Sequence, residues 1–286
     1  MFFSVLIVIV TIFAVLQLKN KNNDRRELLM VWNDGNYEKT YEMTKNALLE
    51  KPVDYFLLTI HGFSAYQLGI SQINNQNTIN YINECIFSLR KAIIHKDAKN
   101  DGRLYYVLGK AYGYKGAEYA DLAVRYLEMA NRLSYDATDI PEYLGLAYAA
   151  YGDYRSSVEA FAKSFIPGKQ PTDSLLLSIA RSYIAMNEYN MALGYLHQCV
   201  ENSPDSKSVI MSRMLLAEVY KNTEEYDKAE LQYISIINES GESAEVRFQL
   251  GELYNLKGDT TRARFEWRMA NRQDPTHARA RARLNI

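Results

Sequence analysis

The feature that most constrains the fold of this chain is a pattern of residue types that recurs along nearly its whole length. In the best copies a leucine or isoleucine directly precedes a glycine or alanine, and an aromatic residue follows three positions after that small residue. Successive copies begin near residues 21, 55, 102, 138, 173, 210 and 244. A repeat of this length predicts a stack of similar supersecondary units, each of which buries its apolar face against its neighbours.

The residue types in this pattern are those that two packed antiparallel helices need. Small residues let the two helices approach closely, and the aromatic residue one helical turn further on fills the space between them. A glycine four positions later is expected to end the first helix in a left-handed backbone conformation, as at Gly116, Gly152 and Gly258. The close-approach positions are Gly109, Gly145, Ala180, Ala217 and Gly251, and the packing tyrosines are Tyr112, Tyr148, Tyr183, Tyr220 and Tyr254.

The clearest copies run from Leu250 to Pro275 and from Ile179 to Pro204, and their registers agree position by position. In this register the sequence resembles the tetratricopeptide repeat (TPR) family, whose unit is a helix–turn–helix of about 34 residues. The resemblance implies an all-α fold, an α-solenoid of about seven units that covers residues 20–275. It also implies a protein-interaction role and no catalytic one.

Two departures from the pattern and the segment after the last repeat lead to further expectations. An Asn- and Gln-rich insertion near residues 71–80 predicts either a long loop or longer flanking helices. Glu224 occupies the turn position where other copies have glycine, so we expect an altered turn there. Residues 276–286 follow the last repeat, and His277 to Leu284 is predicted to form a short, basic capping helix, because solenoids need a polar end piece.

The segment from Phe2 to Leu18 contains no charged residue and predicts a transmembrane anchor over residues 1–19. A cleaved signal peptide is the alternative, but the segment lacks a basic start and small residues before a cleavage point. A buried core helix fits less well, since no polar face is present. Basic residues follow the segment directly, which favours repeats on the cytoplasmic side, with the periplasm as the alternative. The basic residues are Lys19, Lys21, Arg25 and Arg26.

Composition narrows the function classes. The 33 basic and 34 acidic residues nearly cancel, so the chain lacks the basic excess typical of nucleic-acid binding. The cysteines Cys85 and Cys199 match no metal or redox spacing, and the four histidines are scattered. His197 and Cys199 are two residues apart on a predicted helix and point in different directions. We therefore expect no enzyme activity, no metal, no cofactor and no small-molecule substrate.

The resemblance to tetratricopeptide repeats implies a concave channel lined by the first helices of successive units. The expected partner-binding residues are Tyr106, Lys110, Glu142, Leu146, Leu177, Arg181, Met214, Glu218, Phe248 and Glu252. These mix apolar and charged side chains, which suits an amphipathic segment of another protein. They lack the Lys and Asn couple, four residues apart, with which related repeat domains clamp acidic chaperone tails. A co-chaperone role is therefore disfavoured.

The C-terminal segment is rich in arginine, which indicates either a solvated cap or a patch for an acidic partner. The candidate patch residues are Arg272, Arg279, Arg281 and Arg283. Taken together, the sequence predicts a membrane-anchored scaffold that binds other proteins. The alternatives are a structural subunit of a large membrane-associated assembly and a regulator that holds an enzyme. Self-association through repeat ends is a further expectation that the sequence leaves open.

Overall fold

The computed structural model describes residues 24–240 and 243–285 of the 286-residue chain, and all regular structure in these ranges is helical. The chain divides into two compact units between Tyr151 and Gly152. The membrane anchor expected at residues 1–19 lies outside the described residues. Within the described ranges, no helix has the length and apolar character needed to cross a bilayer.

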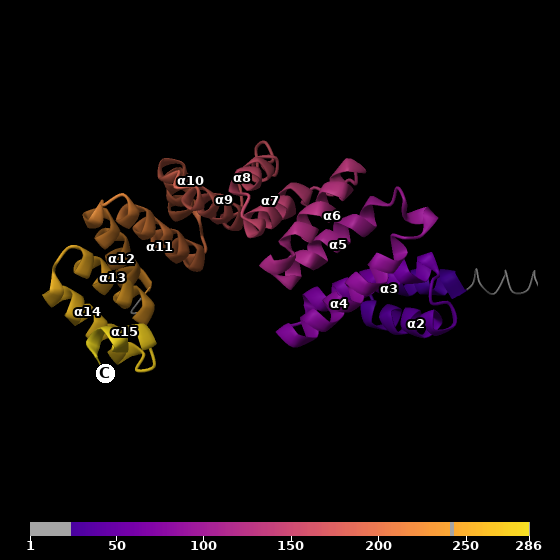
Figure 1. The fold of residues 1–286 in the computed structure, drawn as a ribbon, viewed down its shortest axis with the longest axis horizontal. Helices are drawn as coiled ribbons and strands as arrows, with labels where there is room; N and C mark the ends of the chain where they lie inside the picture. Colours follow the sequence, from indigo (N-terminus) through magenta and orange to yellow (C-terminus); the bar gives the residue numbers. More distant parts are fainter. Residues whose placement is uncertain (1–23, 241–242, 286) are drawn as a thin grey trace, which may run out of the picture. The chain divides into compact units, whose positions relative to one another are not determined.

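The first unit consists of helical hairpins that stack in chain order (Figure 1). Residues 24–33 form its first helix. The helices that follow are α2 (Tyr37–Glu50), α3 (Tyr55–Ser71), α4 (Asn75–Ala92), the short η1 (Lys96–Ala98), α5 (Gly102–Lys115), η2 (Ala117–Tyr119), α6 (Ala120–Arg132) and α7 (Ile140–Tyr151). The first helices of successive hairpins also touch, because α3 contacts α5 and α5 contacts α7. These three helices therefore line one face of the unit.

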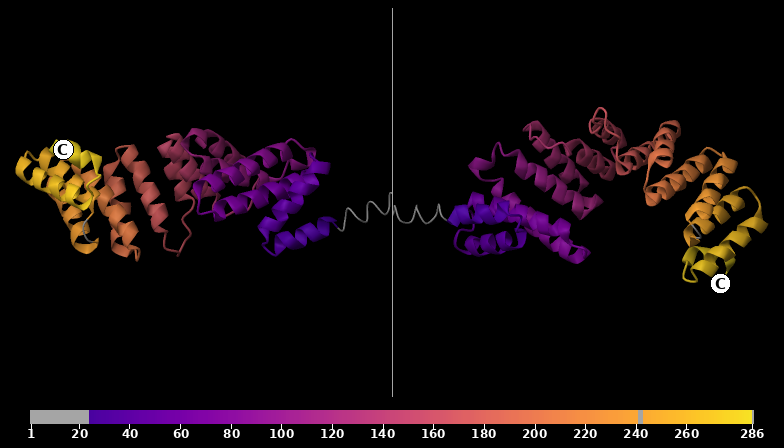
Figure 2. Two further views of the ribbon diagram at one scale, coloured as in Figure 1. Left: turned by 90° about the horizontal axis from the view of Figure 1, so that it is seen from below. Right: turned by 180° about the vertical axis from the view of Figure 1, so that it is seen from behind.

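The second unit repeats this construction, and Figure 2 shows its stacked hairpins from two further sides. Its helices are α8 (Tyr154–Ala162), α9 (Asp173–Ala185), α10 (Tyr189–Asn202), α11 (Ser206–Asn222), α12 (Tyr226–Ser240), α13 (Ala244–Leu256), α14 (Thr260–Gln273) and α15 (Ala278–Leu284). Helices α9 and α11 contact each other as well as their own hairpin partners. The short α15 packs against α14, at the position where the sequence predicts a capping helix.

The insertion in the second repeat lengthens helices. Helices α3 and α4 have 17 and 18 residues, whereas α5 and α6 have 14 and 13, and only residues 72–74 separate α3 from α4. The side chain of Asn74 accepts a hydrogen bond from the Gln76 backbone N–H, which satisfies a free donor at the start of α4. Of the two alternatives from the sequence, the structure therefore shows the extended helices.

The second unit begins with a short helix, which the repeat pattern does not predict. Helix α8 has nine residues and ends at Ala162, so Ser164 lies beyond it rather than in a helical packing position. Pro167, Gly168 and Pro171 follow closely, and Gly168 has a φ of 77°. Proline removes a backbone donor and fixes φ, so this segment is unsuited to a longer helix. The division into two units falls within the same predicted repeat.

Close helix approach at the predicted small residues is seen directly in two hairpins. A Cβ added at Gly109 would lie 2.5 Å from Leu127 Cγ, and one added at Gly251 would lie 2.6 Å from Trp267 Cδ1. The tyrosine hydroxyls find partners, as expected for buried phenols. Tyr254 donates to Glu230 at 2.8 Å, and Tyr220 lies 3.1 Å from His197 Nε2.

The turn at Glu224 keeps the geometry of its glycine counterparts. Glu224 has a φ of 60°, and the Glu225 N–H bonds to the Tyr220 carbonyl at 2.8 Å. The equivalent bond around Gly258 joins the Asp259 N–H to the Tyr254 carbonyl at 2.9 Å. The expectation of an altered turn is therefore wrong, because Glu224 adopts the left-handed conformation that this turn requires.

We expect Glu224→Gly to stabilise the second unit by about 0.5–1 kcal/mol. A non-glycine residue pays roughly 1–2 kcal/mol for the left-handed conformation, and the greater freedom of glycine in the unfolded chain offsets part of that gain. Urea unfolding followed by circular dichroism measures the difference. Glu239→Gly, in the last turn of α12, serves as the control and should destabilise, because glycine weakens the helix and the ion pair with Arg213 is lost. A lower midpoint for Glu224→Gly would contradict this account of the turn.

The histidine at position 61 is buried in the first unit. His61 stacks on Tyr41 with ring centroids 4.5 Å apart, and His61 Nδ1 lies 2.9 Å from Thr44 Oγ1. The Thr44 hydroxyl is also 2.8 Å from the Thr40 carbonyl, to which it donates. Since the Thr44 hydroxyl spends its proton on a backbone carbonyl, His61 Nδ1–H is the donor to Thr44. Burial lowers the pKa of His61, and it outweighs the opposing charge of Glu84.

Because the unfolded chain binds the His61 proton more tightly than the folded chain, the stability of the first unit should be greatest above about pH 6.5 and fall below it. We expect thermal unfolding midpoints to decline between pH 7 and pH 5. His61→Gln should flatten this decline, whereas His95→Gln, at a more exposed histidine, should leave it unchanged. An equal decline in the His61→Gln protein would show that other groups cause the acid sensitivity.

Candidate protein-binding groove

The first unit contains a groove of about 350 Å³ between α5 and α7, with α6 as its floor. Its walls carry two large exposed side chains, Tyr114 at 44% exposure and Leu146 at 42%. Small residues form most of the floor and sides, so the surface is hollow where longer side chains would fill it. These small residues are Gly109, Gly113, Gly116, Ala120, Ala123, Ala147 and Ala150.

Two glycines on α5 shape the groove in different ways. Gly109 lies where α5 presses on Leu127 of α6, and it sets the depth of the floor. Gly113, one turn later, is exposed, and a Cβ added there would meet no atom within 4 Å. The space above Gly113 is therefore open groove, and a side chain at this position would enter it without disturbing the packing.

One end of the groove is polar and already neutralised. Lys110 Nζ lies 3.1 Å from Asp139 Oδ2 and donates to the Tyr106 hydroxyl at 2.9 Å. Tyr106 in turn donates to Asp139 at 2.8 Å. Lys110 Nζ also lies 4.0 Å from the ring centroid of Tyr143 and 4.8 Å from that of Tyr106, so two aromatic faces stabilise its charge.

Lys110 and Tyr106 both keep their protons near neutral pH. Burial opposes the charge of Lys110, but hydrogen bonding to Tyr106 and the surrounding tyrosines raise the pKa of Lys110 above its ordinary value. Burial raises the pKa of Tyr106 to about 12. Burial also raises the pKa of Tyr66, which packs edge-on against Tyr114 with centroids 6.1 Å apart. Tyr66 and Tyr106 therefore stay protonated, and Tyr66 supports Tyr114 from beneath the surface.

The structure brings together three of the four first-unit residues predicted for the channel. Lys110 and Leu146 line the groove, and Tyr106 lies beside Lys110. Glu142 is half-buried on α7 and does not line the groove. Sequence reasoning missed Gly113, Tyr114 and Tyr143, because nothing in the repeat pattern distinguishes a glycine that opens a groove from one that packs. An aromatic residue following a glycine in the last turn of a first helix is the signal that identifies Tyr114.

In the second unit the predicted channel residues differ in accessibility. Arg181 and Glu218 are exposed, whereas Leu177 and Met214 are half-buried and pack on the core of the unit. Phe248 is only 5% exposed, so its side chain is not accessible to a partner, whereas the sequence predicts that it lines the channel. The ring centroids of Phe248 and His277 are 5.1 Å apart, and Arg279 Cζ lies 4.7 Å from the Phe248 centroid.

The predicted acidic-partner patch is also divided by the fold. Arg279 pairs with Glu245, and Arg283 pairs with Glu252 through two hydrogen bonds. Arg279 and Arg283 therefore hold α15 on α13, although their side chains stay 59% and 48% exposed. Arg272 and Arg281 are exposed, Arg272 in the last turn of α14 and Arg281 in α15. A hollow of about 530 Å³ remains beside α15, between α13 and the end of α11.

The candidate chemical groups are built into the packing. Cys85 and Cys199 are both buried, and burial raises the pKa of each thiol. His197 contacts Tyr220, whereas Cys199 Sγ lies 3.9 Å from the Ser208 carbonyl, so the two side chains have separate surroundings. In the described part of the chain, no group of three His, Cys, Asp or Glu residues is arranged to hold a metal ion.

Comparison with known proteins supports the repeat assignment. Residues 174–206, which span α9 and α10, match the family model described as Tetratricopeptide repeat. No curated protein sequence matches the chain. Taken with the stacked hairpins of each unit, the family match identifies the fold as that of TPR proteins, an all-α solenoid.

Solved structures resemble the chain over most of its length. The C-terminal part of a TPR repeat-containing protein from Cytophaga hutchinsonii matches with a TM-score of 0.63 at 15% identity, covering 89% of this chain and 97% of that chain. PilW, described as a widely conserved type IV pilus biogenesis factor, matches with a TM-score of 0.61 at 15% identity over 78% and 98%. YrrB, described as a TPR protein with an unusual peptide-binding site, matches with a TM-score of 0.50 at 21% identity over 69% and 98%. Identities this low concern the fold alone.

Proposed function

We propose that this protein is a membrane-anchored scaffold that binds a segment of a partner protein in the groove between α5 and α7. The observation that carries the proposal is the groove itself, with Tyr114 and Leu146 exposed above a floor of glycine and alanine. Pockets that bind peptide side chains combine apolar walls with a few polar groups at their ends. Lys110 and the Tyr106 hydroxyl supply that polar end.

The chemistry of the groove defines the kind of segment that it accepts. Because Asp139 neutralises Lys110, the groove does not select strongly for an acidic partner. An apolar side chain over Gly113, flanked by residues that hydrogen-bond, complements the surface best. The peptide-binding site in the description of YrrB, a protein with the same fold, adds support by analogy.

The membrane anchor is the second part of the proposal and rests on sequence. The uncharged segment from Phe2 to Leu18 is close to the length that a spanning helix needs. The basic residues that follow it favour repeats on the cytoplasmic side. Protease treatment of intact and permeabilised cells tests on which side of the membrane the repeats lie. Digestion of the repeats from outside the inner membrane would place them in the periplasm instead.

Partner binding is tested by filling the groove. We expect Gly113→Leu to place a side chain in the open space and to reduce partner crosslinking from a photoreactive residue at position 146 by at least tenfold. The matched control is Gly194→Leu, since Gly194 is also exposed, helical and without a neighbour within 4 Å. Equal crosslinking in both variants would exclude the groove as the binding site.

Recovery of one stoichiometric assembly would favour a structural subunit over an adaptor.

A further inference from the structure

The outer face of α14 carries a cluster of arginines that the repeat packing does not use. Arg264, Arg268 and Arg272 are four residues apart, so they follow one side of the helix, and all three are exposed. Phe265 lies beside them at 55% exposure. Thr261 completes this surface, which we call the α14 face. Helix α14 lies at the outer edge of its unit in Figures 1 and 2.

The charges of the α14 face are not balanced within the fold. Arg264, Arg268 and Arg272 form no ion pair or hydrogen bond with a described side chain. Four other arginines around this last hairpin are paired: Arg247 with Glu266, Arg262 with Asp259, Arg279 with Glu245 and Arg283 with Glu252. Arg281 on α15 is exposed like the arginines of the α14 face.

The one acidic residue within α14 does not offset these charges. Glu266 is buried and bonds to Arg247 at 2.9 Å on the inner side of the helix. The α14 face therefore presents three uncompensated positive charges around an exposed aromatic ring.

The shape of this surface indicates the kind of partner. The α14 face lies on the outer side of the helix (Figure 1), and none of its residues lines the hollow beside α15. A peptide binds best where walls surround it, whereas exposed cations around a projecting aromatic ring fit a flat anionic layer. Leu231 on α12 holds the repeat position that Phe265 holds on α14, because each follows a buried alanine (Ala229 or Ala263) by two residues. Leu231 is also exposed, at 60%.

We propose that the α14 face binds the surface of an anionic lipid bilayer. The three guanidinium groups contact lipid phosphates, and Phe265 enters the interfacial layer, where aromatic rings are favoured. The site is distinct from the groove between α5 and α7, and it needs neither that groove nor the expected anchor. It would hold the last repeat against a membrane that contains phosphatidylglycerol or a similar anionic lipid.

The test measures the position of α14 relative to lipid in the full chain. Cys85 and Cys199 are buried, so a fluorophore attached to Thr261→Cys reports the α14 face selectively. Vesicles are made with phosphatidylglycerol or with phosphatidylcholine alone, and each contains a lipid with brominated acyl chains as the quencher. We expect quenching in phosphatidylglycerol vesicles at low salt and little quenching in phosphatidylcholine vesicles. Quenching in phosphatidylglycerol vesicles should be lost in about 0.5 M salt, because salt screens the attraction between exposed charges.

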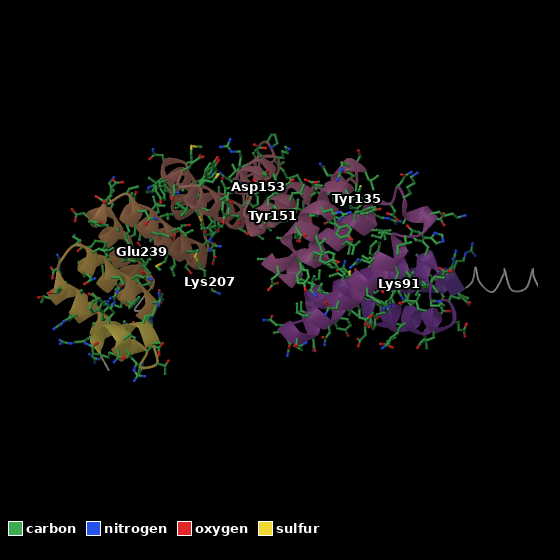
Figure 3. The ribbon with its side chains drawn as sticks, in the orientation of Figure 1. Lys91, Tyr135, Tyr151, Asp153, Lys207 and Glu239 are labelled. Atoms are coloured by element: carbon green, nitrogen blue, oxygen red, sulfur yellow. The ribbon has the colours of Figure 1, made fainter. Side chains whose placement is uncertain are left out.

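The decisive variant is Arg264→Gln/Arg268→Gln/Arg272→Gln. Each arginine is expected to contribute roughly fivefold to lipid affinity. Removing all three should therefore raise the lipid concentration needed for half-maximal quenching about a hundredfold. Lys163→Gln/Lys169→Gln/Lys207→Gln removes the same charge from exposed positions in the same unit and should change quenching little. Lys207, labelled in Figure 3, lies at the start of α11, away from α14.

Circular dichroism first establishes that both triple variants are folded. Three outcomes would overturn the proposal. These are unchanged quenching in the arginine variant, an equal loss in the lysine variant, and equal quenching in both vesicle types. Photocrosslinking from position 261 to a protein, lost in the arginine variant while lipid quenching is absent, would assign the α14 face to an acidic protein instead.

Discussion

Gly109→Val is expected to destabilise the first unit by about 3 kcal/mol. The Cβ alone would lie 2.5 Å from Leu127 Cγ and 3.0 Å from the Leu127 backbone nitrogen, and the backbone atom has no alternative rotamer. Overpacking of this kind costs roughly 1–3 kcal/mol, and valine adds two methyl groups to the same contact. Helices α5 and α6 must separate to accept them. Urea unfolding and the hydrogen exchange of the α5 and α6 amides measure the loss.

Gly113→Ala, one turn later on the same helix, provides the matched control for Gly109→Val. Its Cβ meets no atom within 4 Å, so only backbone entropy and helix propensity change. We expect Gly113→Ala to stabilise the unit by about 0.5–1 kcal/mol. Opposite signs for the two substitutions would identify close approach as the reason for glycine at 109. Destabilisation by both, to a similar extent, would contradict this explanation.

The repeat pattern predicted the hairpins because it records local steric needs. A glycine where two helices touch, such as Gly251 against Trp267, and a glycine that ends a helix, such as Gly258 with a φ of 79°, are both visible in the sequence. Helices begin at Tyr55, Gly102, Ile140, Asp173, Ser206 and Ala244, within four residues of the starts read from the pattern.

The division between the units was not predicted, because it depends on the short α8 and the segment after it. The repeat pattern continues through Ser164, which shows that residue types alone do not report where a helix stops. The Glu224 turn also shows that residue type alone does not determine local backbone conformation. Glutamate is unusual in the left-handed conformation, yet the bond from Glu225 to the Tyr220 carbonyl closes the turn as it does after Gly258. The tertiary hairpin overrides the local preference.

The candidate site was only partly accessible to sequence reasoning. Lys110 and Leu146 follow from their place on the first helices, which the family resemblance supplies. The depth of the groove does not, since it depends on what the neighbours of Gly113 leave empty. For the arginines, composition indicates a basic end, but only the packing of α15 shows that Arg279 is paired with Glu245 whereas Arg268 has no acidic partner among the described residues.

Removal of residues 277–286 is expected to cost the second unit about 3 kcal/mol and to promote self-association. Helix α15 covers Phe248, with His277 and Arg279 over its ring, and Arg283 lies 5.5 Å from the Trp267 ring centroid. Exposing most of one large apolar side chain costs roughly 1.5–3 kcal/mol, and Trp267 and Ala280 add to this. Solenoids without a polar end piece also expose a surface on which copies can stack.

The ion pairs of α15 contribute less than its apolar cover, and a second variant separates the two effects. Arg279→Gln/Arg283→Gln removes the pairs with Glu245 and Glu252 but leaves Ala280 buried against the core. Exposed pairs contribute roughly 0–1 kcal/mol each, so this variant should lose about 1 kcal/mol and stay monomeric by sedimentation in conditions where the truncated protein associates. If the double variant were as unstable as the truncated one, charge pairing rather than apolar cover would hold α15 in place, and the stabilisation should then decline steeply with added salt.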